Sequence, residues 1–116
     1  MSEPFFAGKE KWKVTLEEAK AAPIPEGARS SLLMRHGTML LRYYAPKGKD
    51  AQTPHDQDEL YIVASGTGTF VNGADRTRFK QGDALFAAAG QVHRFEDFSD
   101  DFSTWVVFYG AKGGES

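Results

Sequence analysis

Residues 53–73 read TPHDQDELYIVASGTGTFVNG, and this stretch decides the fold class. Leu60-Tyr61-Ile62-Val63 is rich in residues that favour β-strands, and Ser65-Gly66 ends the run. Thr69–Val71 leads to Asn72-Gly73, a dipeptide typical of a two-residue hairpin turn. The alternating residues 76–79 then predict a returning strand.

Further short β-type segments lie on both sides of this stretch, at residues 32–35, 39–45, 84–88, 92–95 and 104–109. About eight strands at intervals of roughly ten residues predict an all-β sandwich or barrel. Phe95, Phe98 and Phe102 have a spacing that also suits a helical face. We favour a strand that ends near Asp97 and a turn over residues 99–101, because Asp and Ser clusters form turns.

The chain has 116 residues, which is enough for one domain. We expect an N-terminal arm with a short helix over 1–30, a β-barrel domain over 31–110 and a flexible tail over 111–116. The helix is predicted for residues 15–22, with Thr15 as its cap and Glu18 at the capping-box position. Pro23 and Pro25 end it.

The composition excludes several classes of protein. The net charge is −2 and there is no cysteine, so we expect neither nucleic-acid binding nor disulfide, thiol or cysteine–zinc chemistry. No apolar run approaches 18 residues and the N-terminus does not resemble a signal peptide, so we expect no membrane partner. We expect the cytoplasm as the location.

The candidate ligands for a metal ion come from the three histidines and their acidic neighbours. On a straight strand His55 and Glu59 would lie roughly 13 Å apart, too far to share an ion whose ligands are about 2 Å away. A turn through residues 56–58 would bring them face to face on adjacent strands. His93 is the natural third ligand, and two imidazoles with one carboxylate suit Fe(II) or catalytic zinc.

Two motifs resemble those of the cupin superfamily: His55-x3-Glu59-x6-Gly66 and Gly82-x7-Gly90-x2-His93. The resemblance implies a small single-domain cupin, with a double-stranded β-helix (a jelly-roll barrel), a metal bound by His55, Glu59 and His93, and a homodimer. The chain departs from the family pattern in three places: Thr53 stands where the first motif usually has a histidine, Ala88 replaces a proline, and Asp97 replaces an asparagine. Water, a substrate atom or Gln57 could fill the position left by Thr53.

Other residues are assigned with their alternatives left open. Tyr61 shares a strand face with Glu59, and Phe95 shares one with His93, so both could line a pocket beside the metal or fill the core. Thr53 is the third expected pocket residue. His36 precedes a glycine, and we interpret it as a turn residue rather than a ligand. The last strand, residues 104–109, is apolar on both faces and needs cover from the N-terminal segment or a second subunit.

These residues suggest a metal-dependent enzyme that acts on a small oxygen-bearing metabolite. Fe(II) or Mn(II) would serve dioxygenation, and Zn or Ni would serve isomerisation or hydrolysis. Tyr61, or Glu59 if it is not a ligand, could move protons. Two alternatives stay open: a non-enzymatic module that binds or senses a small molecule, and a structural dimer with a vestigial site.

Overall fold

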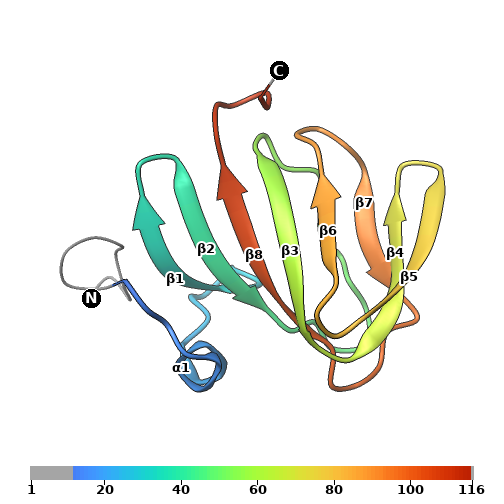
Figure 1. Ribbon diagram of the computed structural model, residues 1–116, viewed down its shortest axis with the longest axis horizontal. Helices are drawn as coiled ribbons and strands as arrows, with labels where there is room; N and C mark the ends of the chain where they lie inside the picture. Colours follow the sequence, from blue (N-terminus) through green and yellow to red (C-terminus); the bar gives the residue numbers. More distant parts are fainter. Residues whose placement is uncertain (1–11, 116) are drawn as a thin grey trace.

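The computed structural model describes residues 12–115 and contains one helix and eight strands in this range (Figure 1). The eight predicted strand segments are confirmed, with bounds shifted by a few residues. The elements are α1 Leu16–Ala21, β1 Ser31–His36, β2 Met39–Tyr44, β3 Asp58–Ser65, β4 Thr67–Asn72, β5 Asp75–Lys80, β6 Ala84–Ala87, β7 His93–Glu96 and β8 Ser103–Tyr109.

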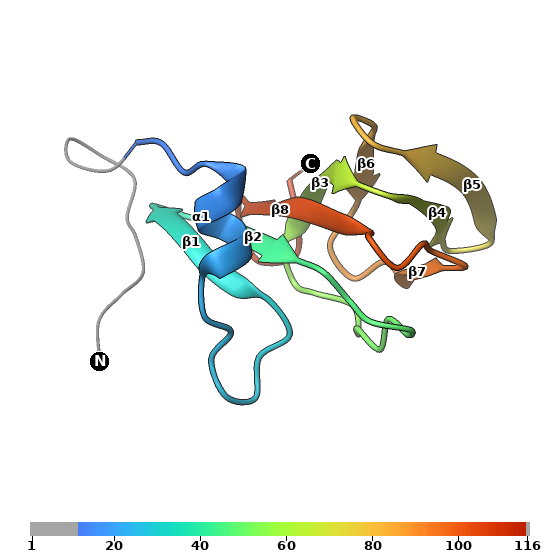
Figure 2. The same ribbon diagram turned by 90° about the horizontal axis from the view of Figure 1, so that it is seen from below.

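The strands form two antiparallel sheets. One has five strands in the order β1-β2-β8-β3-β6, and the other has three in the order β5-β4-β7. In Figure 2, β4, β5 and β7 lie to the right, whereas β1 and β2 lie to the left. The hairpin predicted at Asn72-Gly73 joins β4 to β5, with Asn72 paired to Asp75. The expected all-β class is confirmed.

An aromatic core fills the space between the sheets. Phe95 of β7 contacts Phe70 and Tyr61 at ring-centroid distances of 5.3 and 5.0 Å. It also packs against Phe102 at 4.8 Å and Phe79 at 5.6 Å. Tyr61 belongs to the five-stranded sheet, Phe70, Phe79 and Phe95 belong to the three-stranded sheet, and Phe102 directly precedes β8. Their joint burial therefore holds the two sheets together.

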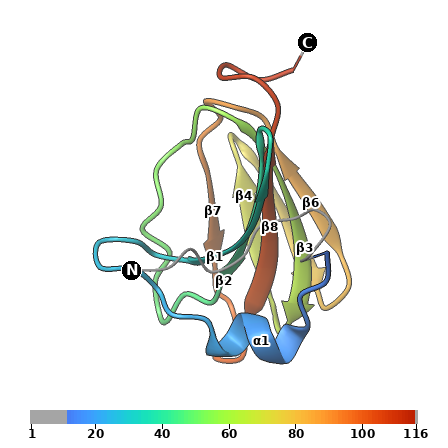
Figure 3. The same cartoon turned by 90° about the vertical axis from the view of Figure 1, so that its left-hand side faces the viewer.

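Helix α1 covers part of the outer face of the five-stranded sheet. Thr15 and Glu18 form the predicted capping box at its start. Ala19 is buried with Leu33 and Tyr43, and Trp105 of β8 packs against the same cluster. The helix lies at the lower end of the sheet in Figure 3. The N-terminal segment therefore supplies part of the cover expected for the outer face of the last strand.

The segments around β7 and after β8 relate to two further expectations. β7 ends at Glu96 and a turn follows at residues 100–101, so the turn interpretation of this stretch is confirmed. The C-terminal segment, expected to be a flexible tail, forms hydrogen bonds with the main body, from Gly113 N–H to the Asp56 carbonyl (2.7 Å) and from Glu115 N–H to the Asp58 carboxylate (2.9 Å).

Other predictions remain open. Residues 1–11 of the predicted N-terminal arm lie outside the described residues, as does residue 116. Within residues 12–115 no helix has the length and hydropathy needed to cross a bilayer. The expected cytoplasmic location stays a prediction.

Candidate metal centre

Three side chains that are distant in the sequence meet at one end of the barrel interior. His55, Glu59 and His93 each offer a donor atom, and these atoms all lie within 4.8 Å of one another. Nε2 of His93 lies 3.2 Å from Oε2 of Glu59, and Nε2 of His55 lies 4.0 Å from Oε1 of the same carboxylate. The predicted convergence is confirmed, whereas metal binding itself stays a prediction.

Each of the three residues is placed by a different part of the fold. Glu59 lies on β3 and His93 begins β7, in opposite sheets. The prediction that His55 lies on a strand beside Glu59 is wrong, because residues 51–57 form an irregular segment. Pro54 has no N–H to donate to a strand ladder, and the His55 carbonyl instead accepts a hydrogen bond from Gly90 N–H at 2.8 Å. The turn before His93 thus holds His55 in position.

The imidazole of His93 is oriented for metal binding. Its Nδ1 lies 2.8 Å from the carbonyl oxygen of Gln91, which can only accept, so Nδ1 carries the hydrogen and Nε2 faces Glu59. Burial lowers the pKa of His93. The hydrogen bonds to Glu59 and Gln91, together with the negative charges of Glu59 and Asp50, outweigh burial and raise the pKa above its usual value. The surroundings of His93 therefore favour a positive charge, whether on the imidazole or on a bound metal ion.

Tyr61 joins the group through its phenol. Its hydroxyl donates to Oε1 of Glu59 at 2.7 Å and lies 3.0 Å from Nε2 of His93. It also lies 3.2 Å from Oε1 of Gln52. Burial, and then the negative charge of Glu59, raise the pKa of Tyr61 well above its ordinary value. Tyr61 therefore keeps its proton and acts here as a hydrogen-bond donor.

Asp50 and Gln52 support this array, although no motif or periodicity in the sequence marks them. The buried carboxylate of Asp50 accepts hydrogen bonds from the Tyr44 hydroxyl, from the Gln52 side chain (2.6 Å) and from Phe95 N–H of β7 (2.8 Å). Since β7 is an edge strand, its outward N–H group needs such a partner. Asp50 thus ties the loop that carries His55 to the strand that carries His93.

The donor set fits a divalent metal ion. Ligands about 2.0–2.2 Å from an ion such as zinc lie about 3–4 Å from one another, so small rotations of the present side chains suffice. Two imidazole nitrogens and one carboxylate suit Fe(II), Zn, Mn or Ni, and three protein ligands leave coordination positions open. The donor set does not select among these metals.

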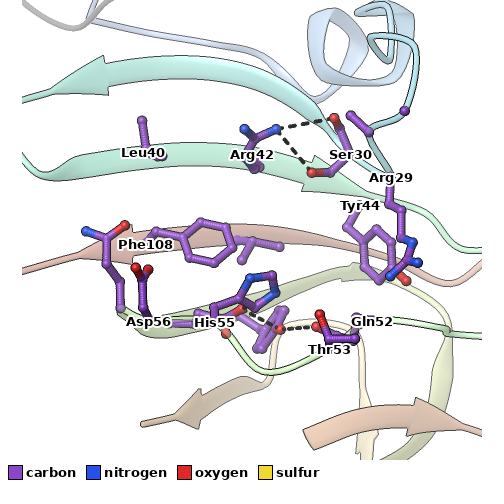
Figure 4. Close-up of a pocket in the computed structure, with 16 residues that line it drawn as sticks. Arg29, Ser30, Leu40, Arg42, Tyr44, Gln52, Thr53, His55, Asp56 and Phe108 are labelled. Carbon is purple, nitrogen blue, oxygen red and sulfur yellow. Dashed lines mark hydrogen bonds and ion pairs between the residues drawn. The ribbon is translucent and has the colours of Figure 1, made fainter. Parts of the chain in front are cut away.

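A pocket of about 410 Å³ opens beside these residues (Figure 4). Thr53 and Tyr61 line it, as predicted, together with His55 and Glu59. The assignment of Phe95 to the pocket is wrong, because its ring is only 2% exposed and packs inside the aromatic core. The other lining residues are Gly27, Ala28, Arg29, Ser30, Leu40, Arg42, Tyr44, Gln52, Asp56, Gln57, Val106 and Phe108.

Gln57 is engaged elsewhere. Its amide nitrogen donates to the backbone carbonyls of Thr38 (3.1 Å) and Gly110 (2.9 Å). These bonds anchor the side chain to two loops rather than to the three candidate ligands, and they give no support to Gln57 as an additional ligand. His36 ends β1 beside the turn at residues 37–38 and is not part of the group.

The comparison with known families agrees with this geometry. Residues 40–109, more than half of the chain, match the family model described as the cupin domain. The chain belongs to the cupin family. A curated relative of this cupin is the uncharacterized protein SCO3923 of Streptomyces coelicolor, 34% identical over 94 residues, which cover 80% of this chain and 88% of the relative.

Solved structures place the cupin in the double-stranded β-helix fold. A conserved protein with a double-stranded β-helix domain from Klebsiella pneumoniae has a TM-score of 0.68 and 22% identity, with 90% of this chain and 92% of that chain covered. A cupin 2 conserved barrel domain protein from Salinispora arenicola has a TM-score of 0.66 and 18% identity, with 87% and 91% covered. The predicted fold class is therefore confirmed.

Proposed function

We propose that this cupin binds a divalent metal ion through His55, Glu59 and His93 and acts on a small oxygen-bearing metabolite in the adjacent pocket. The observation that carries the proposal is the convergence of three donor atoms within 4.8 Å beside a pocket of about 410 Å³. A buried carboxylate and a buried histidine are costly unless they are paired or hold an ion. Glu59 lines the pocket together with His55, and Nε2 of His93 lies 3.2 Å from Oε2 of Glu59, which supports a binding role.

The residues around the metal would have different roles. His55, Glu59 and His93 hold the ion, and the Gln91 carbonyl fixes the orientation of the His93 ring. The metal supplies either oxygen activation, for Fe(II) or Mn(II), or Lewis-acid catalysis of isomerisation or hydrolysis, for Zn or Ni. Tyr61 holds a proton at its phenolic oxygen, hydrogen-bonded to Glu59, where it can donate to a ligand oxygen.

A non-enzymatic module that binds or senses a small molecule is the second candidate. The described residues that line the pocket include no lysine and one histidine, His55. Tyr61 is a poor base because its pKa is raised. The pocket thus lacks an obvious base separate from the ligand set, which is the observation that favours this alternative. The vestigial-site reading rests on Thr53 alone.

Oxygen uptake and isomerisation assays separate the two candidates. Protein loaded with Fe(II) would be tested for oxygen consumption with a panel of diketones and enols, and protein loaded with Zn or Ni for isomerisation of hydroxy-ketones and sugars. Turnover that depends on the metal and is lost in His93→Ala supports the enzyme. Full metal occupancy with no turnover of any substrate supports the binding module.

A homodimer is part of the proposal. The outer face of the five-stranded sheet carries a row of paired apolar residues, Val107 of β8, Leu60 of β3 and Phe86 of β6. Phe86 is 48% exposed. A second copy of the chain would cover this row. Analytical ultracentrifugation tests the dimer: the wild type should sediment as a dimer, and Phe86→Lys should shift the equilibrium to the monomer.

A further inference from the structure

Arg42 lies on the same inner face of the five-stranded sheet as the candidate ligand Glu59. It pairs with Val106 of β8, which in turn pairs with Tyr61 of β3. The three residues thus form one row across the sheet. Two strand spacings of about 4.8 Å place the Cα atoms of Arg42 and Tyr61 about 10 Å apart. Arg42 therefore faces the metal centre across the pocket.

The guanidinium of Arg42 is not paired with an acid. Its hydrogen bonds are to the carbonyl and hydroxyl oxygens of Ser30, both at 3.4 Å, and are drawn in Figure 4. Within residues 12–115 it forms no ion pair. Burial, and then the nearby charge of Arg35, lower the pKa of Arg42. A half-buried cation with two long hydrogen bonds to neutral groups is costly unless an anion binds it.

The floor of the pocket between Arg42 and the ligands is apolar. Val106 and Phe108 of β8 lie between β2 and β3 and line the pocket. Phe108 also contacts the ring of His55, with centroids 5.0 Å apart. A hydrocarbon segment of a ligand would therefore lie over Val106 and Phe108.

The charges that line the pocket favour an anion. Arg29 adds a second cation to the lining, and its guanidinium donates to the backbone carbonyl of Ala51. Asp56 and Glu59 are the acidic lining residues, and Glu59 would be neutralised by the metal. With a divalent ion bound, the pocket carries a net positive charge.

We propose that the ligand of this pocket is a small organic acid, whose carboxylate binds the guanidinium of Arg42 while oxygen atoms at its other end face the metal centre. The inference rests on the proposed function, since the metal holds the second end of the ligand. Arginine is suited to this task because its planar donors bind a carboxylate through two parallel hydrogen bonds. Arg42 is then the residue that selects ligands with a carboxylate at the end far from the metal over ligands that are neutral at that end.

Two five-carbon acids that differ only at the far end test the proposal. 2-Oxoglutarate and 2-oxopentanoate share the same 2-oxo acid group for the metal, but only the first has a second carboxylate. Titration calorimetry with zinc-loaded protein should show 2-oxoglutarate bound at least tenfold more tightly. Arg42→Met should reduce this preference to within about twofold, with an unchanged zinc content. Arg42→Gln, which keeps a polar side chain for Ser30, should give the same result if Arg42→Met does not fold.

Arg78→Met is the matched control. Arg78 is exposed on β5 in the other sheet, and its substitution removes the same charge without touching the pocket. This variant should keep the wild-type preference. Equal binding of the two acids by wild-type protein, binding of neither, or a preference that survives in Arg42→Gln overturns the proposal. Failure of the wild type to take up zinc contradicts the proposed metal site instead, and the role of Arg42 falls with it.

Discussion

The phenolic oxygen of Tyr61 lies 2.7 Å from Oε1 of Glu59, and both residues are only 1% exposed. This hydrogen bond orients the carboxylate that would bind the metal. Tyr61→Phe removes the donor and keeps the ring in the aromatic core. We expect the affinity for zinc to fall by about 10- to 100-fold, as for other residues that orient metal ligands.

Competition with a chelator of known affinity measures this change. Tyr43→Phe is the control, because Tyr43 packs under α1 on the outer face of the sheet. Its affinity for zinc should equal that of the wild type. An unchanged affinity in Tyr61→Phe would show that the phenol does not orient the ligand.

Asp50 should contribute strongly to stability because its buried carboxylate accepts hydrogen bonds from Tyr44, Gln52 and Phe95. Asp50→Ala leaves these donors without partners, and we expect a loss of about 3 kcal/mol in the free energy of unfolding. Urea titration followed by circular dichroism measures it. Asp100→Ala, at an exposed turn, should cost less than about 0.5 kcal/mol. Similar losses in both variants would contradict the anchoring role of Asp50.

Gly66, which ends the first motif, should not tolerate a side chain. Its φ of +86° is unfavourable for other residues, and an added Cβ would lie 2.5 Å from Cα of Phe102. Gly66→Ala should destabilise the protein by about 3 kcal/mol, from both backbone strain and overpacking.

Gly82→Ala provides the comparison for Gly66. Gly82 has a φ of +91° but nothing within 4 Å of an added Cβ. Only the strain applies, and the expected loss is about 1 kcal/mol. Equal losses in the two alanine variants, measured by urea titration, would show that the close approach to Phe102 is unimportant.

Glu96 should make stability depend on acid pH. Hydrogen bonds from Arg76 and then Arg94 lower the pKa of Glu96 below its ordinary value of 4.5. The contribution of a carboxylate with a lowered pKa is fully present above the pKa of the unfolded chain and is lost as the pH falls through the folded pKa. Glu96→Gln should therefore have a lower urea midpoint than the wild type at pH 7, and the difference should shrink as the pH falls below 4.5. A difference that is constant with pH would exclude this pair of ionic contacts as its source.

The strands and the candidate ligands were predictable from local patterns. The β-prone run at residues 60–63, the hairpin at Asn72-Gly73 and the glycine spacing before His93 are read from neighbouring residues. Such signals do not depend on the rest of the fold. The capping box of Thr15 and Glu18 is local in the same way.

The pocket wall was not predictable, because it depends on strand pairing between distant segments. Arg42 faces Glu59 only because β8, the last strand in the sequence, lies between β2 and β3 in the sheet. One local signal was present: every second residue of a strand points to the same face, so Leu40, Arg42 and Tyr44 share one face of their strand. Asp50 and Gln52 lie in a loop, where no periodicity indicates which side chains point inward. Phe95 belongs to the core because its ring packs against four other aromatic rings, which come from distant parts of the sequence.

The content of bound metal tests the central claim most directly. Protein purified without added metal is incubated with zinc and desalted. Elemental mass spectrometry should then find about one equivalent of zinc per chain. His93→Ala should lose the metal, and His36→Ala, at an exposed strand end, should retain it. Less than about a tenth of an equivalent in the wild type, or equal content in both variants, would contradict a metal centre built from His55, Glu59 and His93.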